Sequence, residues 1–82
     1  MEIRIIGSNT KEGYELRKRV IDVVMELDEK VTVSLEDDIK LIKKYNITKR
    51  PALIINNNLT IEGRLITSRE LNKILKSKYK LK

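Results

Sequence analysis

The sequence predicts a single α/β domain in which the elements run strand, helix, strand, helix, strand, strand, helix. Three observations support this prediction. A chain of 82 residues is long enough for one hydrophobic core and too short for two. Short β-branched runs alternate with stretches whose apolar residues recur at helical spacing. Glycine, asparagine and proline separate these segments. We expect one domain over residues 1–82, with 79–82 as a frayed tail.

The first strand and helix are the first elements expected. An isoleucine-rich run at residues 3–6 has high β-propensity, and Gly7 ends it. Asn9 and Glu12 have the spacing of a capping box, in which side chains satisfy free N–H groups at a helix start. We therefore expect a helix over residues 10–27.

This first helix has apolar residues around about half of its circumference, in two stripes. The stripes are Leu16, Val20, Val23 and Leu27 on one side and Tyr14, Ile21 and Met25 on the other. A helix that is apolar on two sides needs two partners. We expect the sheet to cover one stripe and another helix to cover the second.

A second strand and a short helix follow. Residues 31–35 alternate with period two, which predicts a strand parallel to the first with a right-handed crossover. A helix is expected over residues 37–45, with Asn46 as a left-handed terminator. The acidic run 36–38 suits the positive end of the helix dipole. As a Mg²⁺ or Ca²⁺ site the run is disfavoured, because consecutive carboxylates on one turn diverge.

A hairpin is predicted next. Pro51 precedes the apolar run 52–55 and sits where the missing N–H of a strand's first residue is tolerated. Asn57 and Asn58 suit a two-residue turn, because asparagine tolerates positive φ. Residues 59–62 then form the return strand.

The closing helix has the clearest local signal. Thr67 as N-cap with Glu70 forms a capping box, and Ile66 with Leu71 forms the accompanying hydrophobic staple. The helix should end near Ser77, because Lys78 would fall on its apolar side.

The positive charge is concentrated at the end of the chain. The net charge is +6, and residues 64–82 hold seven basic side chains against one acidic side chain, so residues 1–63 are neutral. On the closing helix the basic residues form one ridge. They are Arg69, Lys73, Lys76 and Lys80. Such a ridge is either a solvated helix face or a surface for an acidic partner.

The composition excludes several classes of chemistry. With no cysteine and no histidine, the chain has no disulfide, thiol nucleophile, iron–sulfur ligand or histidine general base. We expect no cofactor and no metal. No apolar run approaches the ~20 residues of a membrane span, and the N-terminus lacks a signal-peptide pattern. We therefore expect a cytoplasmic protein without membrane partners.

The order of elements resembles the thioredoxin/glutaredoxin fold. More narrowly, the chain is similar to the small archaeal and bacterial thioredoxin-like proteins sometimes called redox-active disulfide proteins. The resemblance rests on this order, on the segment 7–16, on Arg50-Pro51-Ala52-Leu53 and on Gly63 before a capped helix. It implies a four-stranded mixed sheet with helices one and three on one face and helix two on the other. It also implies a cis Arg50–Pro51 bond.

The chain departs from this family at the reactive motif. The family's Cys-x-x-Cys motif lies where the first helix begins, and by matching offsets Thr10 and Gly13 occupy the two cysteine positions. Neither residue forms a thiolate, and no histidine is present to activate the threonine hydroxyl. The resemblance therefore implies a redox-inactive protein. The helix N-terminus and the backbone of Arg50 remain as the parts that bind ligands in the family.

Three functions remain open. The first is a binding module for an unidentified protein or peptide. Its groove would be lined by Ser8, Asn9, Thr10, Tyr14, Arg50 and Pro51. The same residues would also serve as ordinary caps and turns. The second is a nucleic-acid or acidic-partner binder using the basic ridge, although aromatic residues for base stacking are scarce. The third is an unrelated enzyme using Ser8, Thr10 or Tyr14, which no tuned lysine supports.

The oligomeric state is not fixed by these patterns. The free edge of the second strand and the apolar surface of the first helix are the two places where a dimer could form.

Overall fold

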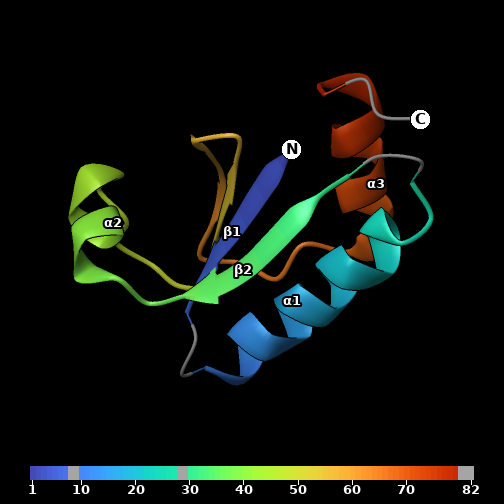
Figure 1. Cartoon of the computed structure of the whole chain (residues 1–82). Coiled ribbons are helices and arrows are strands. Elements are labelled where there is room, and N and C mark those ends of the chain that lie inside the picture. The colour runs from blue at the N-terminus through green and yellow to red at the C-terminus, as the bar shows by residue number, and fades with distance from the viewer. Residues whose placement is uncertain (8–9, 28–29, 80–82) are drawn as a thin grey trace.

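The computed structural model describes residues 1–7, 10–27 and 30–79 of the chain. Seven elements follow one another in the predicted order (Figure 1). They are β1 (Glu2–Ile6), α1 (Lys11–Val24), β2 (Thr32–Glu36), α2 (Ile39–Lys44), β3 (Ala52–Ile55), β4 (Asn58–Glu62) and α3 (Ser68–Ser77). The fold class predicted from the sequence is confirmed.

The four strands form one mixed sheet in the order β2-β1-β3-β4. β1 is parallel to β2 and antiparallel to β3, and β3 is antiparallel to β4. The parallel pair arises because α1 carries the chain back across the sheet, as a βαβ crossover requires. The two central strands, β1 and β3, therefore supply most of the buried sheet residues.

Helices α1 and α3 cover one face of the sheet (Figure 1). Ile3, Ile5, Leu53 and Ile55 point into this face, because strand residues two apart share a side. Leu16 of α1 and Leu71 of α3 are fully buried against them. Each such leucine contributes roughly 2 kcal/mol through removal of its apolar surface from water.

The short helix α2 covers the other face. The second core there is built on Ile6, Ala52 and Ile54, and Ile47 from the segment after α2 joins it. Asn46 ends the helix region with φ of 53°, as predicted. The core is small because α2 spans only 6 residues and has no fully buried residue of its own.

The boundaries of the first two helices differ from the prediction. α1 ends at Val24 rather than 27, and α2 occupies 39–44 rather than 37–45. Thr10, not Asn9, is the N-cap of α1, and its side chain accepts from the N–H of Gly13. Asn9 lies outside the described residues. α2 begins at Ile39 because Asp38 is its N-cap, with a side chain that accepts a hydrogen bond from the N–H of Lys40.

The prediction that both apolar stripes of α1 are covered is wrong. The stripe of Leu16, Val20 and Val23 is buried and meets both the sheet and α3. On the other stripe, Tyr14 is 59% exposed and Met25 is 78% exposed. One stripe is enough for both partners, because α3 packs beside α1 on the same face of the sheet.

The hairpin turn is one residue earlier than predicted. Asn56 and Asn57 have φ of 48° and 67°, and Asn58 already belongs to β4. Positive φ at both central residues is the pattern of a type I′ turn, which matches the twist of the flanking strands. Three consecutive asparagines suit this geometry equally well, so the register depends on how Ile55 and Asn58 pair across the sheet.

The closing helix starts and ends as predicted. Thr67 caps α3 by accepting from the N–H of Glu70, and Ile66 and Leu71 are both fully buried in the same core. Tyr79 is not part of a frayed tail: it packs against the core, with its hydroxyl 3.5 Å from the carbonyl oxygen of Ile55. Residues 80–82 lie outside the described part. Within that part, no helix is long and apolar enough to cross a membrane.

Candidate functional site

The start of α1 is held by a closed set of hydrogen bonds. The Thr10 hydroxyl donates to the carbonyl oxygen of Gly7 at 2.8 Å and accepts from the N–H of Gly13 at 2.9 Å. The Thr10 N–H donates to the same Gly7 carbonyl at 3.1 Å. Thr10 therefore uses both hydrogen-bonding functions of its hydroxyl to join the end of β1 to the first turn of α1.

Gly13 has no room for a side chain. A Cβ built there would overlap the carbonyl oxygen of Gly7 and would lie 2.9 Å from Thr10 Oγ1. The close approach explains a glycine inside a helix, where it otherwise costs about 1 kcal/mol relative to alanine. Position 13, which the resemblance would match to the second cysteine, therefore has no space for a side chain.

The Arg50–Pro51 segment lies directly against this turn. A Cβ on Gly7, which has φ of 130°, would lie 3.4 Å from Pro51 Cα and 3.6 Å from Arg50 Cβ, besides 3.3 Å from Thr10 Oγ1. The Arg50–Pro51 bond is cis, as the resemblance implied. Thr10, Arg50 and Pro51 are therefore brought together around Gly7, although 40 positions separate the first two in sequence.

Two carboxylates hold the segment before Pro51. The Glu62 side chain of β4 accepts from the backbone N–H groups of Thr48 and Lys49, and these bonds lower the pKa of its carboxyl group below 4.5. Asp37 binds the Arg50 guanidinium at 2.7 Å. Neither acidic residue was predicted to take part in the site, because both partners are distant in sequence.

Arg50 precedes β3 and is not part of the sheet. Within the described part of the chain, no hydrogen bond joins its N–H or its carbonyl oxygen to another backbone group. The next residue, Pro51, accepts from Gly63 through its carbonyl oxygen. Arg50 itself is exposed and Pro51 is buried.

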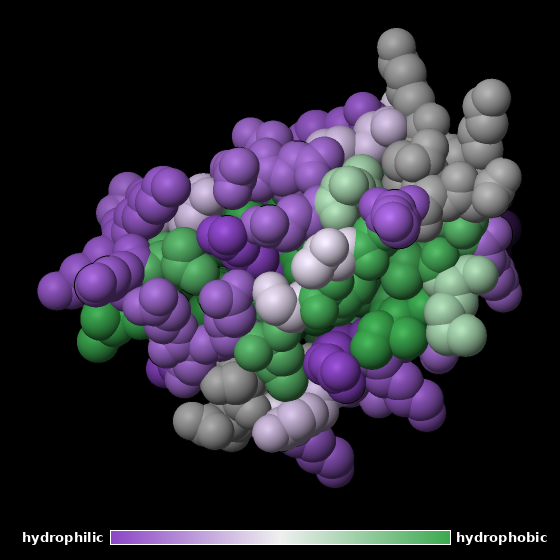
Figure 2. Space-filling model, viewed as in Figure 1, coloured by the Kyte–Doolittle hydropathy of each residue, from purple (hydrophilic) through white to green (hydrophobic). Residues whose placement is uncertain are grey.

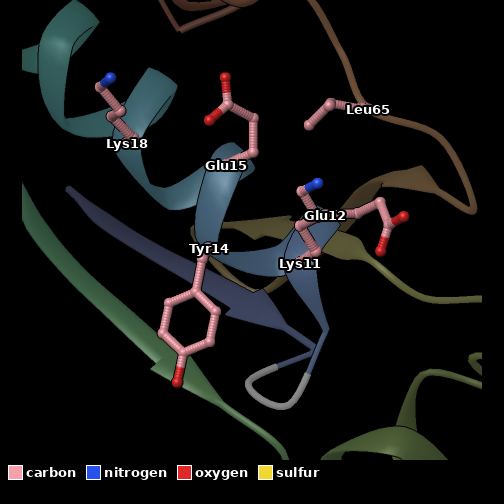
Figure 3. Close-up of a pocket in the computed structure, with 6 residues that line it drawn as sticks. All are labelled: Lys11, Glu12, Tyr14, Glu15, Lys18 and Leu65. Atoms are coloured by element: carbon pink, nitrogen blue, oxygen red, sulfur yellow. The ribbon is translucent and has the colours of Figure 1, made fainter.

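Tyr14 borders a surface hollow on α1. The hollow has a volume of about 540 Å³ and is lined by Lys11, Glu12, Tyr14, Glu15, Lys18 and Leu65. Figure 3 shows the Tyr14 ring extending from α1 away from the other labelled side chains. Two basic and two acidic residues balance the charge of the lining. Leu65 comes from the segment between β4 and α3, so its place there was not evident from the sequence.

The other predicted site residues lie elsewhere or outside the described part. Ser8 and Asn9 are outside it, as is Lys80. Arg69, Lys73 and Lys76 are exposed on α3. The three carboxylates of the acidic run 36–38 have separate roles. Glu36 lies near Arg4, Asp37 binds Arg50 and Asp38 caps α2.

A sequence model of the thioredoxin domain matches residues 1–76. The chain belongs to the thioredoxin domain family. The match covers every strand and helix except the end of α3. Neither the search of curated proteins nor the search of solved structures gave a match.

Thiol–disulfide exchange is closed to this thioredoxin domain. That reaction needs a thiolate nucleophile, and this chain contains no cysteine. Among the described residues, the functional groups beside the helix start are a hydroxyl that is already bonded, a guanidinium and the backbone groups of Arg50. These groups can form hydrogen bonds, and none of them can form a disulfide.

Proposed function

We propose that this thioredoxin domain is a redox-inactive module that binds an extended segment of a protein or peptide. The binding groove that we propose would run past the start of α1 and the Arg50–Pro51 segment. The predicted lining residues are Ser8, Asn9, Thr10, Tyr14, Arg50 and Pro51. The observation that carries the proposal is the assembly of Thr10, Arg50 and Pro51 around Gly7. Each has an atom within 3.3–3.6 Å of the point where a Cβ on Gly7 would lie.

The backbone groups of Arg50, which have no partner among the described residues, supply the means of binding. An extended segment that lies beside Arg50 gains N–H···O bonds of the kind that add a strand to a sheet. Backbone pairing gives affinity without demanding one sequence, and neighbouring side chains then select among ligands. Tyr14, with 59% of its surface exposed, offers an aromatic contact of the type enriched at interfaces.

The experiment begins with a selection of random extended peptides on the immobilised protein. The best binder is then titrated into ¹⁵N-labelled protein. We expect shift changes at Thr10, Tyr14 and Arg50, and a loss of affinity of about tenfold for Tyr14→Ala, the size of loss common for a truncated interface aromatic. Arg50→Glu should weaken binding by a similar factor.

Two controls separate binding from folding. Asp37→Asn breaks the ion pair of Arg50 but keeps the guanidinium, so it should bind more tightly than Arg50→Glu. Lys73→Glu makes the same charge change on α3. Equal affinity for the wild type, Tyr14→Ala and Arg50→Glu would remove this groove as the binding site.

A second candidate is a binder of nucleic acid or an acidic protein that uses α3. The observation in its favour is that Arg69, Lys73 and Lys76 are exposed and have no acidic partner in the described ranges, whereas Arg64 is paired with Glu70. Phosphate binding by such residues weakens steeply with salt. A gel shift at low salt with single- and double-stranded probes tests the candidate, and no retardation at micromolar protein would end it.

A further inference from the structure

Strand β2 is at one edge of the sheet, and its backbone has a free side. Thr32 donates to the carbonyl oxygen of Met1, and the carbonyl oxygen of Glu36 accepts from Gly7, so these residues point toward β1. Backbone groups alternate in direction along a strand. The N–H and C=O groups of Val33 and Leu35 therefore point outward, where the described residues offer no strand to pair with them.

The two edges of the sheet differ in protection. At β4 the pairing with β3 is interrupted by a shift between Leu53 and Ile54. Such irregularities twist an edge away from further pairing. In contrast, β2 pairs with β1 in unbroken register from Thr32 to Glu36. Within β2 there is no proline and no lysine, the residues that usually prevent edge-to-edge association.

Apolar side chains flank this edge. Val31, Val33 and Leu35 are only partly buried on the α1 side of the sheet. The exposed residues Tyr14 and Met25 lie on α1, the helix that packs over β2. Figure 2 shows apolar side chains gathered on the side of the molecule where β2 and α1 lie. Partly exposed apolar side chains beside an unpaired strand edge commonly mark a protein interface.

We propose that the occupant of this edge is a second copy of the chain, bound by antiparallel pairing of β2 with β2. A twofold axis through Ser34 places Val33 opposite Leu35 of the second copy, and Leu35 opposite its Val33. All four of these residues have outward backbone groups, so each pair exchanges both of its N–H···O bonds. The same surface is used by both copies, as a twofold interface requires.

The charges at the two ends of β2 favour this antiparallel register. Lys30 precedes the strand, and the Met1 α-ammonium lies 3.2 Å from the carbonyl oxygen of Lys30. Asp38 follows the strand, and Asp37 before it is already paired with Arg50. With the axis at Ser34, Lys30 faces Asp38 of the second copy, and the symmetric pair repeats the contact. The two residues before Lys30 in the sequence are Asp28 and Glu29, and they lie outside the described part.

The charges at the two ends of β2 also favour an antiparallel over a parallel second copy. A parallel second copy in the same register would place Lys30 beside Lys30 and Asp38 beside Asp38 of the two copies. The antiparallel arrangement instead joins opposite charges and continues the apolar α1 side across the junction. Like charges placed together at an interface disfavour the wrong arrangement.

Sedimentation equilibrium over micromolar to millimolar concentration tests the proposal, combined with hydrogen exchange of backbone amides. We expect a concentration-dependent dimer in which the amides of Val33 and Leu35 become protected as the dimer forms. A monomer throughout this range would overturn the proposal. So would a dimer without that protection, because it would use another surface, or protection that appears only when a foreign protein is added.

Variants at the edge sharpen the test. Val33→Pro removes an outward N–H and leaves the bonds to β1 intact, as proline on an edge strand allows. Because the twofold interface loses two donors, we expect the dissociation constant to rise at least about tenfold. Circular dichroism and a melting curve at low concentration check that the monomer still folds.

A charge variant tests the same register without touching the strand. Lys30→Glu should weaken the dimer by roughly threefold to tenfold, because two exposed contacts are reversed. Adding Asp38→Asn should recover part of the loss and keep the cap of α2, since asparagine is an equally good N-cap. Lys73→Glu, the same charge change on α3, should leave association unchanged. Equal weakening by Lys30→Glu and Lys73→Glu would contradict the register.

Discussion

The two sides of the candidate site differ in how much freedom they keep. At the start of α1, the Thr10 hydroxyl is doubly bonded and the carbonyl of Gly7 fills the space beside Gly13. Across from it, the backbone of Arg50 has no hydrogen-bond partner among the described residues, and its side chain is about half exposed. The start of α1 is thus a closed, fully bonded helix cap, whereas the Arg50 side has backbone groups without a partner among the described residues.

Two separate features of the α1 side exclude thiol chemistry: the absence of cysteine and the absence of space at Gly13. Replacing the cysteines alone would remove the chemistry and leave the space. Here the space at Gly13 is also gone, because the backbone of the preceding loop occupies it. Substitutions on the α1 side should therefore affect stability, and substitutions on the Arg50 side should mainly affect binding.

The largest effect of a single substitution is expected from Gly13→Ala. Alanine normally stabilises a helix relative to glycine by about 1 kcal/mol. At this position its Cβ would collide with the Gly7 carbonyl, which belongs to the backbone and moves only with the loop. We expect a loss of roughly 2–3 kcal/mol in the free energy of unfolding, measured with urea. Glu12→Ala, an exposed change one residue earlier, is the control, and a neutral or stabilising Gly13→Ala would show that the loop yields freely.

The same collision predicts that placing cysteines at positions 10 and 13 does not give the chain a working Cys-x-x-Cys motif. A Thr10→Cys/Gly13→Cys variant should be less stable than the wild type, because it loses the cap and adds a side chain at Gly13. We expect little or no insulin-reduction activity. Activity near that of an ordinary thioredoxin would contradict the packed state of the α1 side.

A smaller effect is expected from Thr10→Ala. The variant loses the acceptor for Gly13 N–H and the donor to Gly7. Loss of an N-cap side chain costs typically about 1 kcal/mol. Thr10→Ser keeps the hydroxyl and should recover most of the loss in the same urea measurement. If alanine and serine are equally destabilising, the missing methyl group rather than the cap is responsible.

Arg50→Glu should change stability less than either α1 variant. The ion pair with Asp37 is partly exposed, and such pairs contribute about 0–1 kcal/mol. The variant should nevertheless weaken peptide binding, because the guanidinium borders the free backbone groups. Urea midpoints and peptide affinities measured on the same samples compare the two effects. A change of several kcal/mol in stability with unaltered affinity would reverse the proposed division between the two sides.

The smallest effect is a pH dependence at Glu62. Hydrogen bonds from Thr48 and Lys49 lower the pKa of its carboxyl group in the folded state. The stabilisation is therefore present above the ordinary value of 4.5 and is lost as the pH falls through the lowered pKa. The difference in urea midpoint between the wild type and Glu62→Gln should be positive at pH 7 and shrink toward pH 3. A difference that does not change with pH would show that Glu62 does not hold the segment through its charge.

Local sequence determined most of the elements of this protein. β-Branched runs, the helical spacing of Leu16 and Val20, and the capping box at Thr67 predicted element order and type, because each acts over a few neighbouring residues. The family resemblance, carried by the order of these elements and the single proline, supplied the sheet and the cis bond. The composition alone closed thiol chemistry.

Tertiary packing decided the rest. The hairpin turn lies at Asn56 and Asn57, one residue earlier than predicted, because the pairing of β3 with β4 sets its position. The exposure of Tyr14 and Met25 followed from α3 and the sheet meeting α1 on one stripe. The lack of space at Gly13 depends on the path of the preceding loop, and Glu62 accepts hydrogen bonds from Thr48 and Lys49, which are distant in sequence. Such contacts depend on the three-dimensional path of the backbone, which no local pattern specifies.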